Sequence, residues 1–191
     1  MIGGARRRIA RLAAGALLAL ACPPGPAAAS DALDLPEKGR PEFSILAGYG
    51  HWIHVNPGRT REQLGMFQPQ LGLRAGRRLE YLVEGHLAEY WGPRGVAAGL
   101  VPLGARYFFS DRGLDPYFQL GAGLCWTDLR VVEIDRRFNF ILQGAAGLRR
   151  SLEPGRAWTV ELRWLHYSNA GTVRPNYGLN ALVLLGGWRL R

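Results

Sequence analysis

The chain has 191 residues, which suits one domain, and a formal net charge of +9 with only two cysteines. Four arginines near the start supply part of that charge, so residues 30–191 carry only +5 and hold no basic run, which argues against nucleic-acid binding. Cys125 alone remains after residue 29, so we expect neither a disulfide, a cysteine-based metal site nor a cofactor.

Residues 1–29 have the pattern of a secretory signal peptide. An arginine-rich start precedes a short apolar run over residues 12–21, and small residues stand before Ser30. The apolar run is too short to cross a bilayer as a helix. Cys22 allows a lipoprotein alternative, which Ala19 disfavours because a larger aliphatic residue usually stands there. We therefore expect export, a periplasmic lead-in over residues 30–41 and a folded domain over residues 42–191.

After residue 41 the chain reads as short strands separated by turn residues. Hydrophobicity alternates with a period of two in several segments, which predicts strands with one apolar and one polar face. Phe118 and Leu120, for example, alternate with Gln119 and Gly121. Eight strands are predicted, over residues 42–54, 67–78, 79–91, 96–109, 117–128, 138–150, 157–168 and 178–190.

The number and length of these segments match a small transmembrane barrel, in which a tilted strand needs roughly 9–11 residues to cross. The polar faces carry few charges and many small or amide residues, which suits a crowded lumen. A soluble β-sandwich or lipocalin-like barrel is the alternative, because alternation does not say which face points inward. We predict an all-β, eight-stranded antiparallel transmembrane β-barrel. Aromatic residues near strand ends predict interfacial girdles: Trp52, Trp91, Phe108, Phe109, Trp126, Trp158, Trp164 and Trp188.

Charged residues on the polar faces are expected to meet inside the barrel. The predicted lumen network consists of Glu80, Glu84, His86, Arg74, Arg106 and Arg149. His51 and His54 stand at a strand end with no cluster of metal-ligand type around them, so we interpret them as structural hydrogen-bonding residues.

The strand over residues 157–168 ends with two polar residues on its apolar face. His166 and Ser168 continue the face of Trp164, because side chains two apart point the same way. If both termini lie in the periplasm, this strand ends at the outer leaflet. There a histidine base can activate a serine for attack on a lipid ester. By spacing alone, two interfacial polar residues at a strand end are the simpler interpretation.

The surrounding sequence motif favours the catalytic interpretation of His166 and Ser168 over the simpler one. Residues 166–171 (HYSNAG), followed by Pro175-Asn176 and Gly178-Leu179-Asn180, resemble the signature of the lipid A 3-O-deacylases, the PagL-like proteins also called the acyloxyacyl hydrolase family. The resemblance implies an outer-membrane serine esterase that releases a 3-hydroxy fatty acid from lipopolysaccharide. It assigns the nucleophile to Ser168, the base to His166, and oxyanion binding to Asn169 and the Gly171 amide.

Asn180 departs from the family pattern, which has a glutamate that orients the histidine. An asparagine carbonyl accepts the histidine N–H but does not stabilise the imidazolium by charge. Three consequences are open: the activity is weaker, Asp128 or Glu89 orients His166 in place of Asn180, or the site is inactive. Hydrolysis of phospholipid instead of lipid A is also open. The alternative function is a non-catalytic structural or adhesive barrel.

The chain ends Trp188-Arg189-Leu190-Arg191 instead of in the aromatic residue that the barrel-insertion machinery commonly reads. We expect Trp188 to serve that partner from three residues inside the end. A homodimer is left open.

Overall fold

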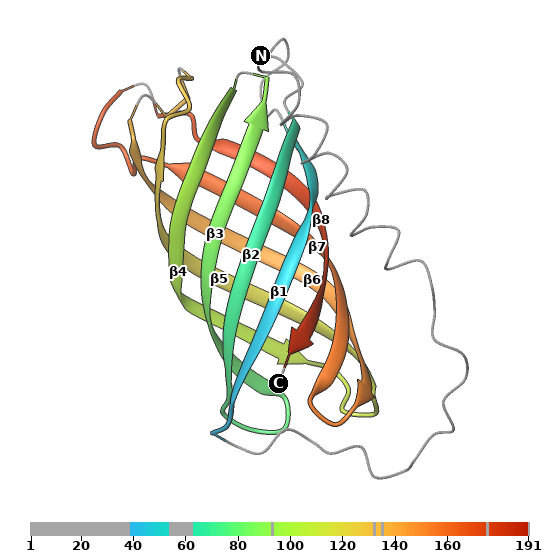
Figure 1. The fold of residues 1–191 in the computed structure, drawn as a ribbon. Coiled ribbons are helices and arrows are strands. Elements are labelled where there is room, and N and C mark those ends of the chain that lie inside the picture. The colour runs from blue at the N-terminus through green and yellow to red at the C-terminus, as the bar shows by residue number, and fades with distance from the viewer. Residues whose placement is uncertain are drawn as a thin grey trace.

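The computed structural model describes residues 39–53, 63–92, 94–131, 133–134, 136–174 and 176–190. They form one closed barrel of eight antiparallel strands, in which each strand pairs with its chain neighbour and β1 pairs with β8 (Figure 1). No helix in these ranges is long and apolar enough to cross a membrane. The predicted signal peptide and His54 lie outside the described residues. The strands are β1 (Pro41–Trp52), β2 (Gln63–Arg74), β3 (Leu79–Trp91), β4 (Arg94–Phe108), β5 (Leu114–Thr127), β6 (Phe138–Glu153), β7 (Arg156–Ser168) and β8 (Leu179–Leu190).

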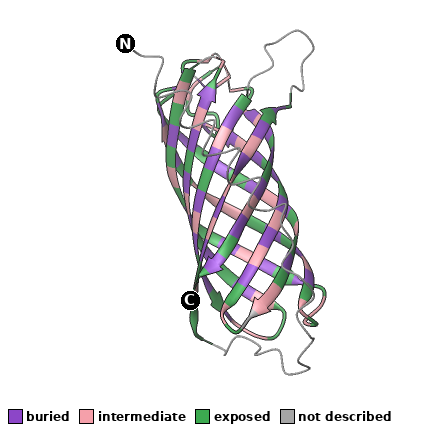
Figure 2. Cartoon of the chain, turned by 45° about the vertical axis from the view of Figure 1, so that its right-hand side comes forward, coloured by how far each residue is buried: buried purple, intermediate pink, exposed green. Residues whose placement is uncertain are grey.

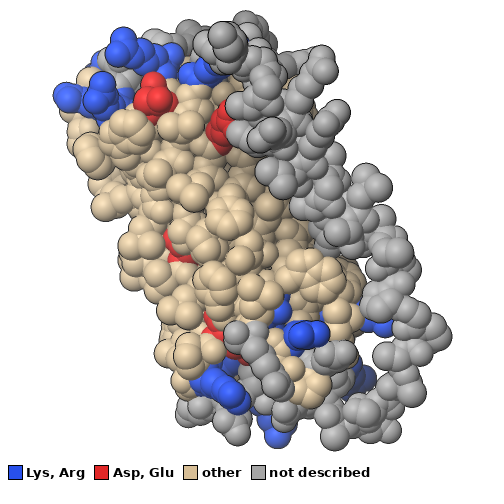
Figure 3. Space-filling view, in the orientation of Figure 1, with Lys and Arg blue, Asp and Glu red and all other residues tan. Residues whose placement is uncertain are grey.

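The barrel is apolar outside and polar inside. Buried and exposed residues alternate along each strand (Figure 2), and in β7 the charged Arg163 is fully buried while Leu162 is 51% exposed. On the face that Figure 3 shows, charged side chains gather mainly at the two ends, with a broad uncharged band between them. A soluble barrel would have the opposite arrangement, so the transmembrane β-barrel prediction is confirmed.

The two ends of the barrel differ in their connections. Turns over residues 75–78, 109–113 and 154–155 join strands at one end. The other end carries the longer connections over residues 128–137 and 169–178, beside a short connection between β3 and β4. Outer-membrane barrels have short periplasmic turns and longer extracellular loops. The end of β7 and the start of β8 therefore belong to the extracellular side.

The second strand is displaced from its prediction. Residues 67–78 were expected, but β2 spans Gln63–Arg74. The predicted strand ran directly into the next one and left no residues for a turn. In the structure the N–H groups of Ala75 and Gly76 donate to the Leu79 carbonyl at 3.0 and 3.3 Å and close that turn.

The fourth strand alternates imperfectly because it contains a β-bulge. The pairing of β3 with β4 shifts register between Leu82 and Glu84, so Pro102 and Leu103 lie opposite the single residue Val83. Both residues of the bulge are exposed. Proline cannot donate to a ladder, which is why it is confined to edges and bulges, and a bulge bends its strand.

Two of the eight predicted girdle residues were wrong. Trp52 and Phe108 are 8% and 1% exposed and lie on the inward face of their strands. Side-chain direction alternates right up to the strand end, so nearness to the interface did not decide it. The other six residues, from Trp91 to Trp188, are at least partly exposed.

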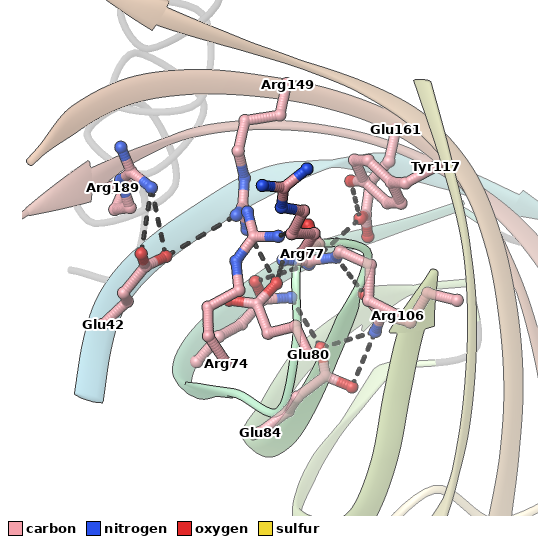
Figure 4. Close-up of polar contacts among 12 residues, drawn as sticks. Glu42, Arg74, Arg77, Glu80, Glu84, Arg106, Tyr117, Arg149, Glu161 and Arg189 are labelled. Carbon is pink, nitrogen blue, oxygen red and sulfur yellow. Dashed lines mark hydrogen bonds and ion pairs between the residues drawn. The ribbon is translucent and has the colours of Figure 1, made fainter. Parts of the chain in front are cut away.

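The lumen is filled by a network of buried charges (Figure 4). Glu80 accepts from Arg106 at 3.0 Å and from Arg149 at 3.1 Å, as predicted. Glu84 pairs with Arg163, which the predicted network did not include, at 3.1 Å. Further members are Glu161, Tyr117, Glu42 and Arg189. Each glutamate of the network lies beside an arginine, as buried charges require.

Two predicted members of the network have other contacts. The Nε2 atom of His86 lies 2.5 Å from the hydroxyl of Tyr167. The guanidinium of Arg74 lies 4.3 Å from the centre of the Phe108 ring and donates to the Arg77 carbonyl. Both are buried in the lumen as predicted, but the contacts described for these two residues are not ion pairs.

Candidate active site

The two predicted site residues lie together on the outer wall. His166 and Ser168 are half-buried at the extracellular end of β7, on the face that Trp164 shares. The strand ends there because Ala170 and Gly171 have positive φ values of 53° and 76°, which turn the chain back toward β8. Both side chains are thus accessible from the lipid and from the rim.

The imidazole of His166 is oriented by Asn180. The two residues are direct partners across β7 and β8, and His166 Nδ1 lies 3.0 Å from Asn180 Oδ1. With the Nδ1 proton donated to the amide oxygen, the lone pair of the ring is on Nε2, where a general base needs it. Neither Glu89 nor Asp128 has a described contact with His166; Asp128 instead accepts the Val96 N–H at 2.6 Å.

Two further residues, to which sequence reasoning gave no contact with His166, hold the ring in place. The Trp164 ring stacks on the His166 ring with a centroid distance of 5.8 Å and an interplanar angle of 17°. Gly178 has a φ of +69°, and a Cβ atom added there would lie 2.5 Å from His166 Cε1. Glycine is therefore needed beside the ring, and its place in the family signature was the available signal.

Ser168 is not bonded to the histidine in this state. Its Oγ accepts the N–H of Ala170 at 3.2 Å, and no described contact joins it to His166. Positions two apart on a strand are separated by roughly 6.5–7 Å, so rotation of the two side chains is needed to bring them into contact. Catalytic hydrogen bonds often form only when substrate is bound.

Asn169 organises the loop that follows the serine. It is 1% exposed, its N–H donates to Asn176 Oδ1 at 3.1 Å and its Nδ2 donates to the Val173 carbonyl at 3.2 Å. Its Oδ1 accepts the Gly171 N–H at 2.9 Å. The structure thus brings the two predicted oxyanion-binding residues together, but it bonds them to each other.

The connection between β5 and β6 supports this loop from the side. The N–H groups of Tyr177 and Gly178 donate to the Glu133 carbonyl at 3.2 and 3.3 Å. Asn169 Nδ2 also reaches the carbonyl of Ile134, whose own side chain is 1% exposed. These contacts join segments far apart in the sequence, and no local pattern signals them.

Tyr167 anchors β7 from within. It lies between the two site residues but points inward, where its hydroxyl meets His86 of β3. It is 3% exposed and packs in the cluster of buried apolar residues that includes Leu165 and Leu179. This packing restricts movement of the strand end that carries His166 and Ser168.

Arginines surround the site on the extracellular side. In Figure 3 blue surface gathers at one upper corner of the molecule, over the outer loops, as well as at the lower end. The exposed arginines of the two loops that meet at the site are Arg130, Arg136, Arg137 and Arg174.

Comparison with known proteins gives one family and one fold. A family model described as lipid A 3-O-deacylase (PagL) matches residues 59–189. The crystal structure of the outer membrane enzyme PagL is 19% identical, with a TM-score of 0.54 over 78% of this chain and 99% of that one. The crystal structure of Neisserial surface protein A (NspA) is 16% identical, with a TM-score of 0.55 over 78% of this chain and 96% of that one. No curated protein matched the chain. At these identities the two structures show the shared barrel fold.

Proposed function

Because the chain belongs to the lipid A 3-O-deacylase family, we propose that it is a serine esterase that hydrolyses the 3-O-linked acyl chain of lipid A. The observation that carries the proposal is the contact of His166 Nδ1 with Asn180 Oδ1, which leaves Nε2 free on the lipid-facing wall beside Ser168. Export by residues 1–29 and insertion by the barrel-insertion machinery, with Trp188 as the residue read, belong to the same proposal.

In the proposed reaction His166 Nε2 removes the proton of Ser168 Oγ as the oxygen attacks the ester carbonyl. The tetrahedral intermediate collapses, and the imidazolium returns the proton to the departing sugar 3-oxygen. Water, activated by the same nitrogen, then cleaves the acyl-serine and releases the 3-hydroxy fatty acid. The Asn180 carbonyl fixes the histidine tautomer throughout.

Asn169 and the Gly171 amide remain the proposed oxyanion-binding groups. Their present hydrogen bond to each other means that they must exchange it for the oxyanion. The Ala170 N–H, which already donates to Ser168 Oγ, lies close enough to the reacting atoms to assist.

The surroundings fit an anionic lipid. The acyl chains of an outer-leaflet lipid meet the apolar wall below the site, and its phosphates meet the exposed arginines of the outer loops. Arginine binds phosphate well because its planar group donates two parallel hydrogen bonds. A phospholipid offers similar esters and phosphate, so the test compares both lipid classes.

A non-catalytic structural or adhesive barrel is the second candidate. The neutral Asn180 favours it, since this residue gives no charge stabilisation to an imidazolium.

Mass spectrometry of lipids from Gram-negative cells that express the protein tests the proposal. The wild type is expected to remove one hydroxyacyl group from lipid A and to leave phospholipids intact. Ser168→Ala and His166→Ala are expected to abolish the loss, while Ser110→Ala, in a turn at the opposite end, retains it. Intact lipid A beside a correctly inserted wild-type barrel supports the non-catalytic alternative.

A further inference from the structure

Exposed arginines surround the periplasmic end of the barrel. Each of the three short turns at this end contains one of them or is flanked by one, and another precedes β1. Part of the resulting blue surface is seen at the lower end of the molecule in Figure 3. We call this set the periplasmic arginine ring, and its members are Arg40, Arg77, Arg78, Arg112, Arg150 and Arg156.

The acidic side chains described at this end do not cancel the charge of the ring. Glu42 pairs with Arg189 in the lumen at 3.1 Å, and Asp115 is buried. Asp111 is half-buried and lies close enough to Arg78 to act on it electrostatically. The described surface of this end is therefore positively charged where it meets the membrane.

Two members of the ring lie against the outer wall of the barrel. Arg150 of β6 faces outward beside its ladder partner Trp158 of β7. Arg78, which precedes β3, forms a side-chain hydrogen bond with Tyr107, an outward residue of β4 that is 44% exposed. Outward aromatic residues near strand ends mark the membrane interface of a barrel. The two guanidinium groups thus lie at the depth of the lipid headgroups.

A lipid phosphate is the group that this arrangement fits. A guanidinium donates two parallel hydrogen bonds to phosphate oxygens, while its aliphatic stem packs along the apolar wall. Water alone would satisfy arginines at the tips of turns, but the placement of Arg78 and Arg150 beside aromatic residues favours a membrane lipid. A headgroup with an ammonium brings a cation near the ring, so a lipid with net negative charge should bind better.

We propose that the periplasmic arginine ring binds anionic glycerophospholipids of the inner leaflet through their phosphates. Because the arginines are distributed over three turns and the start of β1, several lipids can bind around the barrel at once. Each arginine close to an anionic lipid surface strengthens binding roughly fivefold. The ring lies at the opposite end of the barrel from His166 and Ser168, so this proposal does not depend on the proposed esterase.

Photo-crosslinking of the wild-type protein tests the location and the lipid class. The probe is phosphatidylglycerol with a diazirine in its headgroup, present as a minor component of phosphatidylcholine vesicles that hold the protein. Crosslinks are expected in the peptides that contain residues 77–78, 107–112 and 150–158. Unlabelled phosphatidylglycerol should remove these crosslinks, whereas phosphatidylethanolamine should not. Equal competition by the two lipids, or crosslinks confined to the outer loops, would overturn the proposal.

A matched pair of variants separates the ring from the charge of the whole protein. Arg78→Gln/Arg150→Gln removes two charges from the ring, and Arg136→Gln/Arg137→Gln removes two exposed charges from the outer loops. The ring variant should lower the preference of the periplasmic crosslinks for phosphatidylglycerol over phosphatidylethanolamine at least tenfold. The outer-loop variant should keep the wild-type preference at that end. An unchanged preference in the ring variant contradicts the proposal.

The cell wall is the competing partner, because peptidoglycan also carries anionic groups. Co-sedimentation of the detergent-solubilised protein with purified peptidoglycan tests this alternative. The wild type is expected to remain in the supernatant. Sedimentation of the wild type that Arg78→Gln/Arg150→Gln abolishes would assign the ring to the cell wall and overturn the lipid proposal.

Discussion

At the residue scale, the candidate site depends on one neutral orienting group. Asn180 accepts from His166 across the β7–β8 ladder, so it selects the tautomer that a general base needs. It adds no negative charge near the imidazolium that forms during the reaction. Geometry and electrostatics are therefore separable at this position, which makes it a useful place for substitution.

Substitution of Asn180 should change turnover in both directions. Asn180→Glu is expected to raise kcat roughly tenfold, because hydrogen bonds to a charged partner are about 1–1.5 kcal/mol stronger. Asn180→Ala removes the tautomer control and should lower kcat by roughly tenfold or more. Deacylation kinetics on purified lipid A measure both, with Ser168→Ala/Asn180→Glu as an inactive control. Equal rates for Asn180→Ala and wild type would show that another group orients His166.

Gly178 provides the second residue-scale prediction. An alanine Cβ at this position would lie 2.5 Å from His166 Cε1 and 3.2 Å from Nε2, so Gly178→Ala should displace the ring and remove most of the kcat. Gly39→Ala is the matched control, because Gly39 has a similar φ of +84° but nothing within 4 Å of an added Cβ. Both variants carry backbone strain of roughly 1–2 kcal/mol. A similar loss of activity in both would attribute the effect to strain alone, and full activity in Gly178→Ala would remove the steric role.

At the element scale, the strands were predictable because a membrane barrel has the same constraint along each of them. Side chains alternate between lipid and lumen, so Gln119 and Leu120 of β5 were assigned to the correct faces, whereas the bounds of β2 were wrong. The bounds failed because residues 75–78 have no strong turn signal beyond Gly76. The bulge in β4 was missed because it depends on the partners of Pro102.

The candidate site was predictable only where it is local. His166, Ser168 and Asn180 stand close in sequence within a specific motif, and the structure places them on one face. The support from Glu133 and Ile134 depends on how two separate loops meet, and no sequence pattern records that.

At the scale of the whole molecule, the lumen network holds the barrel that carries the site. Glu84, fully buried, accepts from Arg163 of β7 at 3.1 Å and from Gln119 of β5 at 2.9 Å, and also from Gln70 and Gln143. One carboxylate on β3 thus joins strands on several sides of the barrel, including β7, which carries the candidate site. Removal of one partner from such a buried set leaves the others without compensation.

Loss of that single charge should destabilise the whole barrel. In Glu84→Gln, Arg163 keeps Glu161 as its acidic partner but loses Glu84. The new NH₂ group faces the amide donors of Gln70, Gln119 and Gln143, which contact carboxylate oxygens in the wild type. The substitution should therefore lower the free energy of unfolding by about 3–5 kcal/mol. Glu89→Gln is the matched control, since Glu89 lies on the lipid-facing side of the same strand, and it should change stability by about 0.5 kcal/mol or less. Equilibrium urea unfolding in phospholipid vesicles measures both. If Glu84→Gln unfolds at the same urea concentration as Glu89→Gln, the network fills the lumen without stabilising the barrel. The packing of the buried apolar cluster around Tyr167 must then hold β7 in place.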